Sequence, residues 1–124
     1  HDVGHMGFTN SFHKKAETPL ACLYSDQSPL EGMHCAIMLN LLRLPQCDVL
    51  EGLPLSLRGT FRSCATNMIL DTDLAKHVQN LSSFRKEFLC SAHEEDAAPT
   101  PVQRKDLLSF ALKCCDVAHS SKPF

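Results

Sequence analysis

The sequence predicts an all-α fold. Apolar residues recur at three- and four-residue steps over long stretches, which is the period of a helix face. Serine-proline and threonine-proline pairs stand where several of these stretches begin, and both are typical of helix starts. No alternating apolar and polar pattern of useful length is present, so no strand is predicted.

The first half of the chain contains two predicted helices. Residues 1–16 are polar and contain glycine, so we expect loop or short helical turns there. Thr18-Pro19 predicts a cap and a short helix over about 18–25. Ser28-Pro29-Leu30-Glu31 predicts a capping box at the start of a helix that runs to about Leu44. The apolar face of this helix is Leu30, Met33, Ile37, Met38, Leu41 and Leu42.

The second half contains a longer helical pattern. Residues 45–54 are expected to connect to a helix over about 55–89, and Ser82-Ser83 is where a break in it would fall. Residues 91–99 are charged and poor in apolar side chains, which predicts an exposed loop. Thr100-Pro101-Val102-Gln103 predicts a second capping box, and the helix that it opens should end near residues 120–123.

Composition excludes several classes of protein. The chain has 124 residues, about the length of one domain, with 44% hydrophobic and 21% charged residues, which is typical of a globular protein. Twelve basic against 14 acidic residues give a net charge of −2, which argues against nucleic acid as a partner. No apolar run reaches the roughly 18 residues that a membrane span needs.

Seven cysteines, an odd number, cannot all pair within the chain. Cys35, Cys64 and Cys115 fall among apolar residues at helical spacing, which predicts small buried side chains. We therefore expect a reducing, intracellular and cytoplasmic location.

The first polar cluster is His1-Asp2-Val3-Gly4-His5. Imidazole and carboxylate are the ligands that zinc and similar divalent ions prefer. Adjacent His1 and Asp2 can both bind one ion, or the aspartate can bridge two ions, as in phosphoryl transfer by two metals. The alternative for His5 is a surface histidine or one that supports a ligand.

The second polar cluster lies on the predicted helix 28–44. Glu31 and His34 are three residues apart and share one face. The alternative for Glu31 is its role in the capping box, and His34 alone is more often a histidine at a helix interface.

Further acidic residues interrupt the later helices. Asp71-Thr72-Asp73 lies inside the predicted helix 55–89, with His77 four residues after Asp73, and its alternative is a solvated charged face. Asp116 lies near the negative end of the last helix dipole, which is unfavourable without a cation, and its alternative is an exposed aspartate.

Four segments together resemble the class I 3′,5′-cyclic nucleotide phosphodiesterases. They are HDVGHMGFTNSF (1–12), LACLYSDQSPLEGMHCA (20–36), MILDTDLAKHV (68–78) and CCDVAHSSKPF (114–124). They follow one another in the family's order and cover nearly the whole chain.

The resemblance implies an all-helical, bundle-like domain that hydrolyses cAMP, cGMP or both to 5′-monophosphates in signal transduction, with two divalent ions, zinc and magnesium or manganese. Carried over by position, His1, Asp2 and Asp116 would be metal ligands. His5, Glu31 and Thr72 would be catalytic positions that hold waters around the second ion. His34 and Asp73 would orient the ligands. His119 would lie where some members approach the nucleotide base.

The chain also departs from the family pattern, with Gly4, Met6, Gly32, Met33 and Ser120 where other residues are frequent. The family's general-acid histidine would precede residue 1, and its purine-binding glutamine would follow Phe124. We therefore expect residues 1–124 to be a partial catalytic domain, truncated at both ends and inactive by itself. Two other hypotheses remain: another His-Asp phosphohydrolase, and a non-catalytic helical interaction module or pseudoenzyme.

Overall fold

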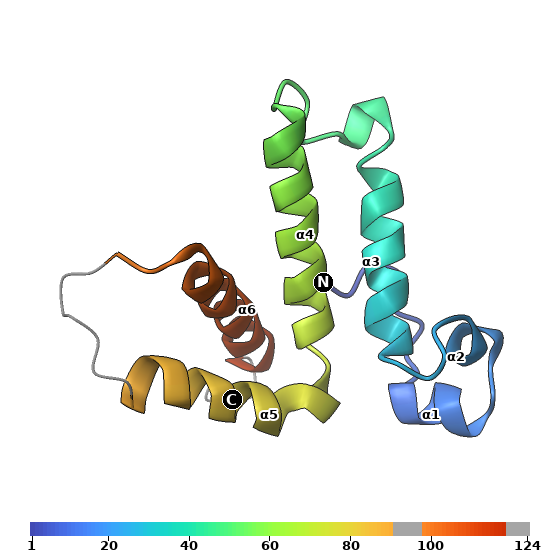
Figure 1. Cartoon of the computed structure of the whole chain (residues 1–124). Helices are drawn as coiled ribbons and strands as arrows, with labels where there is room; N and C mark the ends of the chain where they lie inside the picture. The colour runs from blue at the N-terminus through green and yellow to red at the C-terminus, as the bar shows by residue number, and fades with distance from the viewer. Residues whose placement is uncertain (91–97, 119–124) are drawn as a thin grey trace. The chain divides into compact units, whose positions relative to one another are not determined.

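The computed structural model describes residues 1–90 and 98–118, and every regular element among them is helical (Figure 1), which confirms the all-α prediction. In chain order the elements are α1 (Asn10–Lys15), α2 (Pro19–Leu23), α3 (Pro29–Leu41), η1 (Pro45–Cys47), α4 (Leu55–Asp71), η2 (Leu74–Lys76), α5 (His77–Phe84), η3 (Arg85–Cys90) and α6 (Pro101–Val117). None of the described helices combines the length and the apolar character needed to cross a bilayer. The chain divides into two units, 1–70 and 71–124, and each is described by itself.

Unit 1 contains α1 to α4. The helices α1, α2 and α3 pack against one another, and α3 and α4 run side by side (Figure 1). The Cys35 thiol on α3 donates to the Thr66 carbonyl on α4 at 3.7 Å, which joins this pair. The buried apolar side chains of the unit are Ala21, Leu30, Cys35, Leu50 and Ile69.

The start of α3 differs from the prediction. Ser28 has a left-handed backbone (φ 45°, ψ 57°), and its side chain makes no capping hydrogen bond. The capping-box prediction for Ser28 and Glu31 is therefore wrong, because that box needs an extended backbone at the cap. The amide of Leu30 instead donates to Oδ1 of Asn10, a residue of α1, at 3.0 Å.

An ion pair holds the connection before α4. Arg58 donates to Asp48 Oδ2 at 2.6 Å and to the Leu50 carbonyl at 3.3 Å. This hydrogen bond from Arg58 keeps the pKa of the Asp48 carboxyl below its usual range.

The predicted helix 55–89 is broken earlier than expected. It ends at Asp71, and a new 3-10 turn starts after Asp73, whose carboxylate accepts from the Ala75 amide at 2.9 Å. Ser82-Ser83, where we expected a break, lies inside α5. The reason is local: aspartate and threonine bond neighbouring backbone groups and favour caps over helix interiors.

The start of the last helix confirms its prediction. Thr100 accepts from the Gln103 amide at 3.2 Å, and the Gln103 side chain accepts from the Thr100 amide at 2.9 Å. The structure gives this helix as Pro101–Val117, and the expected end near residues 120–123 lies outside the described residues. Most of the predicted exposed loop 91–99 lies outside the described residues.

The cysteine prediction holds for one of three residues. Cys35 is buried, Cys64 is half-buried and Cys115 is exposed. Burial and the charge of Glu31 both raise the pKa of the Cys35 thiol, so it stays protonated and can donate its hydrogen bond.

Candidate active site

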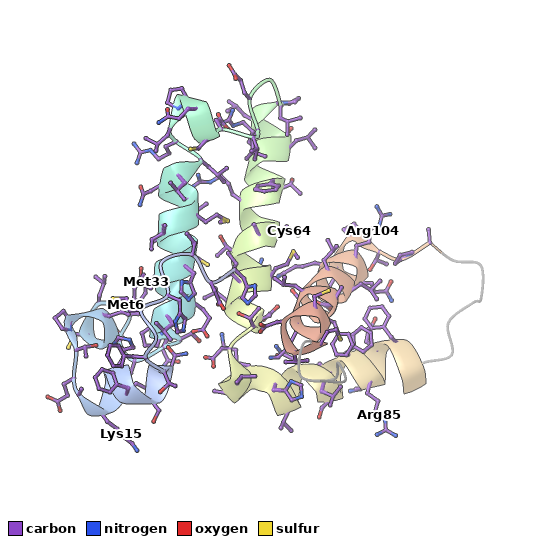
Figure 2. All side chains as sticks on the ribbon, turned by 180° about the vertical axis from the view of Figure 1, so that it is seen from behind. Met6, Lys15, Met33, Cys64, Arg85 and Arg104 are labelled. Carbon is purple, nitrogen blue, oxygen red and sulfur yellow. The ribbon has the colours of Figure 1, made fainter. Side chains whose placement is uncertain are left out.

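The N-terminal segment folds back onto α3. The amide of His5 donates to the Asp2 carbonyl at 3.1 Å, and Gly4 between them has a φ of +78°. A Cβ at Gly4 would lie 2.5 Å from Ile37 Cδ1 on α3. The absence of a side chain at Gly4 therefore allows the segment to lie directly on the helix. Figure 2 shows the side chains of this region, with Met6 and Met33 labelled.

His34 is the group on α3 that meets this segment. Its side chain is 2% exposed, and Nδ1 lies 2.8 Å from the Val3 carbonyl oxygen. A carbonyl can only accept, so Nδ1 carries the proton in this contact. Nε2 of the same ring is 3.8 Å from Asp2 Oδ1, and the ring stacks on that of His5 with centroids 5.8 Å apart. The buried ring thus lies beside both Asp2 and His5.

The carboxylate of Asp2 lies close to two imidazole rings. Its Oδ1 is 3.4 Å from Nε2 of His1 and 3.8 Å from Nε2 of His34. The Asp2 side chain is 60% exposed, so its carboxylate is open to a ligand. Imidazole and carboxylate atoms that face one another in this way are a donor set that fits a zinc-like divalent ion. Unit 1 therefore brings together four of the predicted residues, His1, Asp2, His5 and His34.

Glu31 lies in the first turn of α3 and is half-buried. Its Oε2 accepts from Nδ2 of Asn10 at 2.8 Å. Because the predicted capping box is absent, the carboxylate is not committed to the backbone of its own helix. The role that the family resemblance implies for Glu31 is therefore not blocked by a cap, and it stays a prediction.

Gly32 is explained by the packing of α3. A Cβ at this position would lie 2.6 Å from the ring of Tyr24. The glycine that departs from the family pattern thus lets the aromatic ring lie against the helix backbone.

In unit 2, the predicted pair Thr72 and Asp73 lies at the break between α4 and η2. Both side chains are buried, with exposed fractions of 7%. The expectation that these residues stand in the middle of a helix is wrong. Their burial also contradicts the alternative of a solvated charged face.

Lys113 of α6 holds this break in place. Its ammonium donates to the Asp71 carbonyl at 2.9 Å and to the Asp73 carbonyl at 3.1 Å. Burial lowers the pKa of Lys113, while the charges of Asp71, Asp73 and Asp116 act in the opposite direction. Asp116 therefore contributes to the same charged environment as the Asp71–Asp73 break, and it is half-buried. His119 lies outside the described residues.

Sequence reasoning missed three polar residues of these regions. Asn10 entered only as part of the N-terminal motif, and nothing in the spacing indicates that it contacts Glu31. Lys113 is an ionisable residue in an apolar stretch, and nothing else in the sequence indicates its contacts. His13 is 3% exposed and lies 3.0 Å from the Thr18 hydroxyl, and a lone histidine beside two lysines predicts a surface.

Comparison with known families covers the whole chain. Residues 1–124 match the family described as 3′5′-cyclic nucleotide phosphodiesterase. The human "High affinity cGMP-specific 3′,5′-cyclic phosphodiesterase 9A" is 32% identical over 124 residues, which are 99% of this chain and 20% of that protein. The "3′,5′-cyclic-nucleotide phosphodiesterase regA" of Dictyostelium discoideum is 30% identical over 128 residues, 100% of this chain and 15% of that protein.

Solved structures agree with this result. The phosphodiesterase domain of the RhoPDE fusion protein from the choanoflagellate Salpingoeca rosetta is 32% identical with a TM-score of 0.91, over 99% of this chain and 38% of that one. The structure of LmjPDEB1 in complex with IBMX is also 32% identical, with a TM-score of 0.88. The chain spans about one fifth of the length of the human relative. From its motifs, its helices and these matches, the chain belongs to the 3′,5′-cyclic nucleotide phosphodiesterase family.

Proposed function

We propose that this chain is the metal-binding part of an enzyme that hydrolyses 3′,5′-cyclic nucleotides, cAMP, cGMP or both, to 5′-monophosphates in intracellular signalling. The observation that carries the proposal is the family match over all 124 residues, which includes every motif with a predicted site residue. The described cysteines have free thiols, which supports a reducing, intracellular compartment.

The donor set supports a requirement for two divalent ions, one zinc-like and one magnesium- or manganese-like. His1, Asp2 and Asp116 would hold the zinc-like ion. Bound ions supply neutralisation of the phosphate charge and a lower pKa for the attacking water. The residues of the chain would keep these ligands in place and position water and substrate.

Each remaining site residue has a role of this kind. His5, Glu31 and Thr72 would hold waters beside the second ion. His34 would orient Asp2, because its buried ring is fixed by the Val3 carbonyl and its Nε2 faces that carboxylate. Asp73 would hold Thr72 in place through the cap that it forms at the start of η2.

The test is hydrolysis of cAMP and cGMP by the full-length protein, together with its metal content. Asp2→Ala and Asp116→Ala should each abolish hydrolysis and metal retention together. Glu31→Gln should lower the rate with a smaller loss of metal. Asp106→Ala removes an exposed carboxylate from the same helix as Asp116 and should change neither quantity.

Two outcomes would contradict the proposal. Full activity and full metal content in Asp116→Ala would refute the role of that residue. A wild-type protein that retains no metal and hydrolyses neither nucleotide would instead support the non-catalytic helical module.

A further inference from the structure

We propose that Asn10 is a positioning residue that fixes the Glu31 carboxylate in the orientation needed to hold water beside the second ion. This inference rests on the proposed function, and it adds a residue to which neither the motif nor the comparisons assign a role. It rests on one observation: the side-chain amide of Asn10 bonds both the Leu30 amide at the start of α3 and the Glu31 carboxylate.

The orientation of the Asn10 amide follows from its partners. The Leu30 amide can only donate, so the atom of Asn10 that faces it at 3.0 Å must be the oxygen. The nitrogen of the same amide therefore points toward Glu31, whose Oε2 lies 2.8 Å away. A carboxylate can only accept when it is ionised, so the bond is a charge-assisted N–H donation to Oε2.

Asn10 is itself held in place. It is the first residue of α1, and Thr9 caps this helix by accepting from the Phe12 amide at 3.2 Å. The Asn10 side chain is half-buried between α1 and α3, which contact each other. One carboxylate oxygen of Glu31 is thus bonded to a neighbouring helix. The other oxygen, Oε1, would be the one that holds the water beside the second ion.

This arrangement explains why Glu31 does not turn back to cap its own helix. Ser28 has a left-handed backbone, and Pro29 has no N–H, so the Leu30 amide needs an acceptor from elsewhere. Asn10 supplies that acceptor with its oxygen. One residue therefore both caps α3 and directs the carboxylate.

The two roles can be separated by substitution. Asn10→Asp keeps an acceptor for the Leu30 amide and replaces the donor toward Glu31 by a charged oxygen. We expect kcat to fall about 10–100-fold and the Mg²⁺ concentration that half-saturates the enzyme to rise about 10–100-fold, as is usual for groups that orient metal ligands. Asn40→Asp is the matched control, since among the described residues the exposed Asn40 side-chain amide donates only to the Ala36 carbonyl of its own helix.

A double-mutant cycle distinguishes positioning from stability. If Asn10 acts through Glu31, Asn10→Asp should cost little further activity or metal affinity in a Glu31→Gln background. If Asn10 only caps α3, the two losses should be independent. Affinity for the metal is also measured without substrate, from the rise in unfolding temperature when MgCl₂ or MnCl₂ is added to the metal-free protein.

Two results would overturn the inference: wild-type kcat and metal affinity in Asn10→Asp, or additive losses in the double variant. A wild-type protein that binds Mg²⁺ but hydrolyses no cyclic nucleotide would refute the proposed function. The double-mutant cycle, measured through the metal-dependent rise in unfolding temperature, would still decide the role of Asn10.

Discussion

The buried ammonium of Lys113 should stabilise unit 2 through two backbone carbonyls. Lys113→Met keeps most of the side-chain volume and removes both hydrogen bonds to the Asp71 and Asp73 carbonyls. Because these bonds join α6 to the break after α4, we expect the backbone amides of α6 and of η2 to lose protection from hydrogen exchange together.

The size of the effect follows from the two bonds. The bond to the Asp73 carbonyl is buried, so leaving this acceptor unsatisfied should cost about 1–3 kcal/mol. The bond to the Asp71 carbonyl is partly exposed, so water can replace it at a cost of about 0.5–1 kcal/mol. Burial of the charged ammonium is itself unfavourable, as its lowered pKa indicates. Lys113→Met removes this cost, which offsets part of the loss. A net loss of about 1–3 kcal/mol in the free energy of unfolding corresponds to a change of roughly 5–150-fold in the equilibrium between the folded and the opened state.

Hydrogen exchange on the full-length, metal-free protein measures this loss. Amides of α6 and of η2 should exchange roughly 5–150-fold faster in Lys113→Met. Lys105→Met is the control, because Lys105 lies on the same helix and its ammonium makes no hydrogen bond within the described residues. Unchanged exchange in Lys113→Met, or an equal effect of Lys105→Met, would refute the reasoning.

The same contact has a pH signature. The folded-state pKa of Lys113 lies below the unfolded value of 10.5, so between the two values the unfolded chain binds more protons. Stability must then rise with pH across that interval. Chemical denaturation at increasing pH should show this rise in the wild type and a smaller one in Lys113→Met, and an identical rise in both would assign it to another group.

Two further predictions concern helix backbone and caps. Gly32→Ala should destabilise unit 1 by about 1–3 kcal/mol, because its Cβ would meet the Tyr24 ring, whereas Gly59→Ala meets no atom within 4 Å and should stabilise α4 by about 0.5–1 kcal/mol. Urea denaturation measures both, and equal effects of the two changes would contradict the packing argument. Thr100→Ala should cost about 0.5–2 kcal/mol by removing the acceptor for the Gln103 amide, and Thr100→Ser should restore most of it. If exchange from the first turn of α6 were the same in all three proteins, the cap would have no role in stability.

The sequence alone predicted the helical class, the start of the last helix and several residues of the candidate site. The helical period and the Thr100 box predicted helices that the structure contains, because both depend on interactions within a few residues. The family motifs pointed to His1, Asp2, His5 and His34, and the structure brings these four side chains together.

The tertiary structure decided which polar groups meet across helices. The cap of α3 comes from Asn10 rather than Ser28, because Ser28 has a left-handed backbone and makes no side-chain cap, and α1 offers another acceptor. Lys113 bonds carbonyls about forty positions earlier in the chain, a pairing that no periodicity contains. Local hydrogen bonds follow from residue type and spacing, whereas buried polar contacts between elements depend on how those elements pack, and only the folded chain shows them.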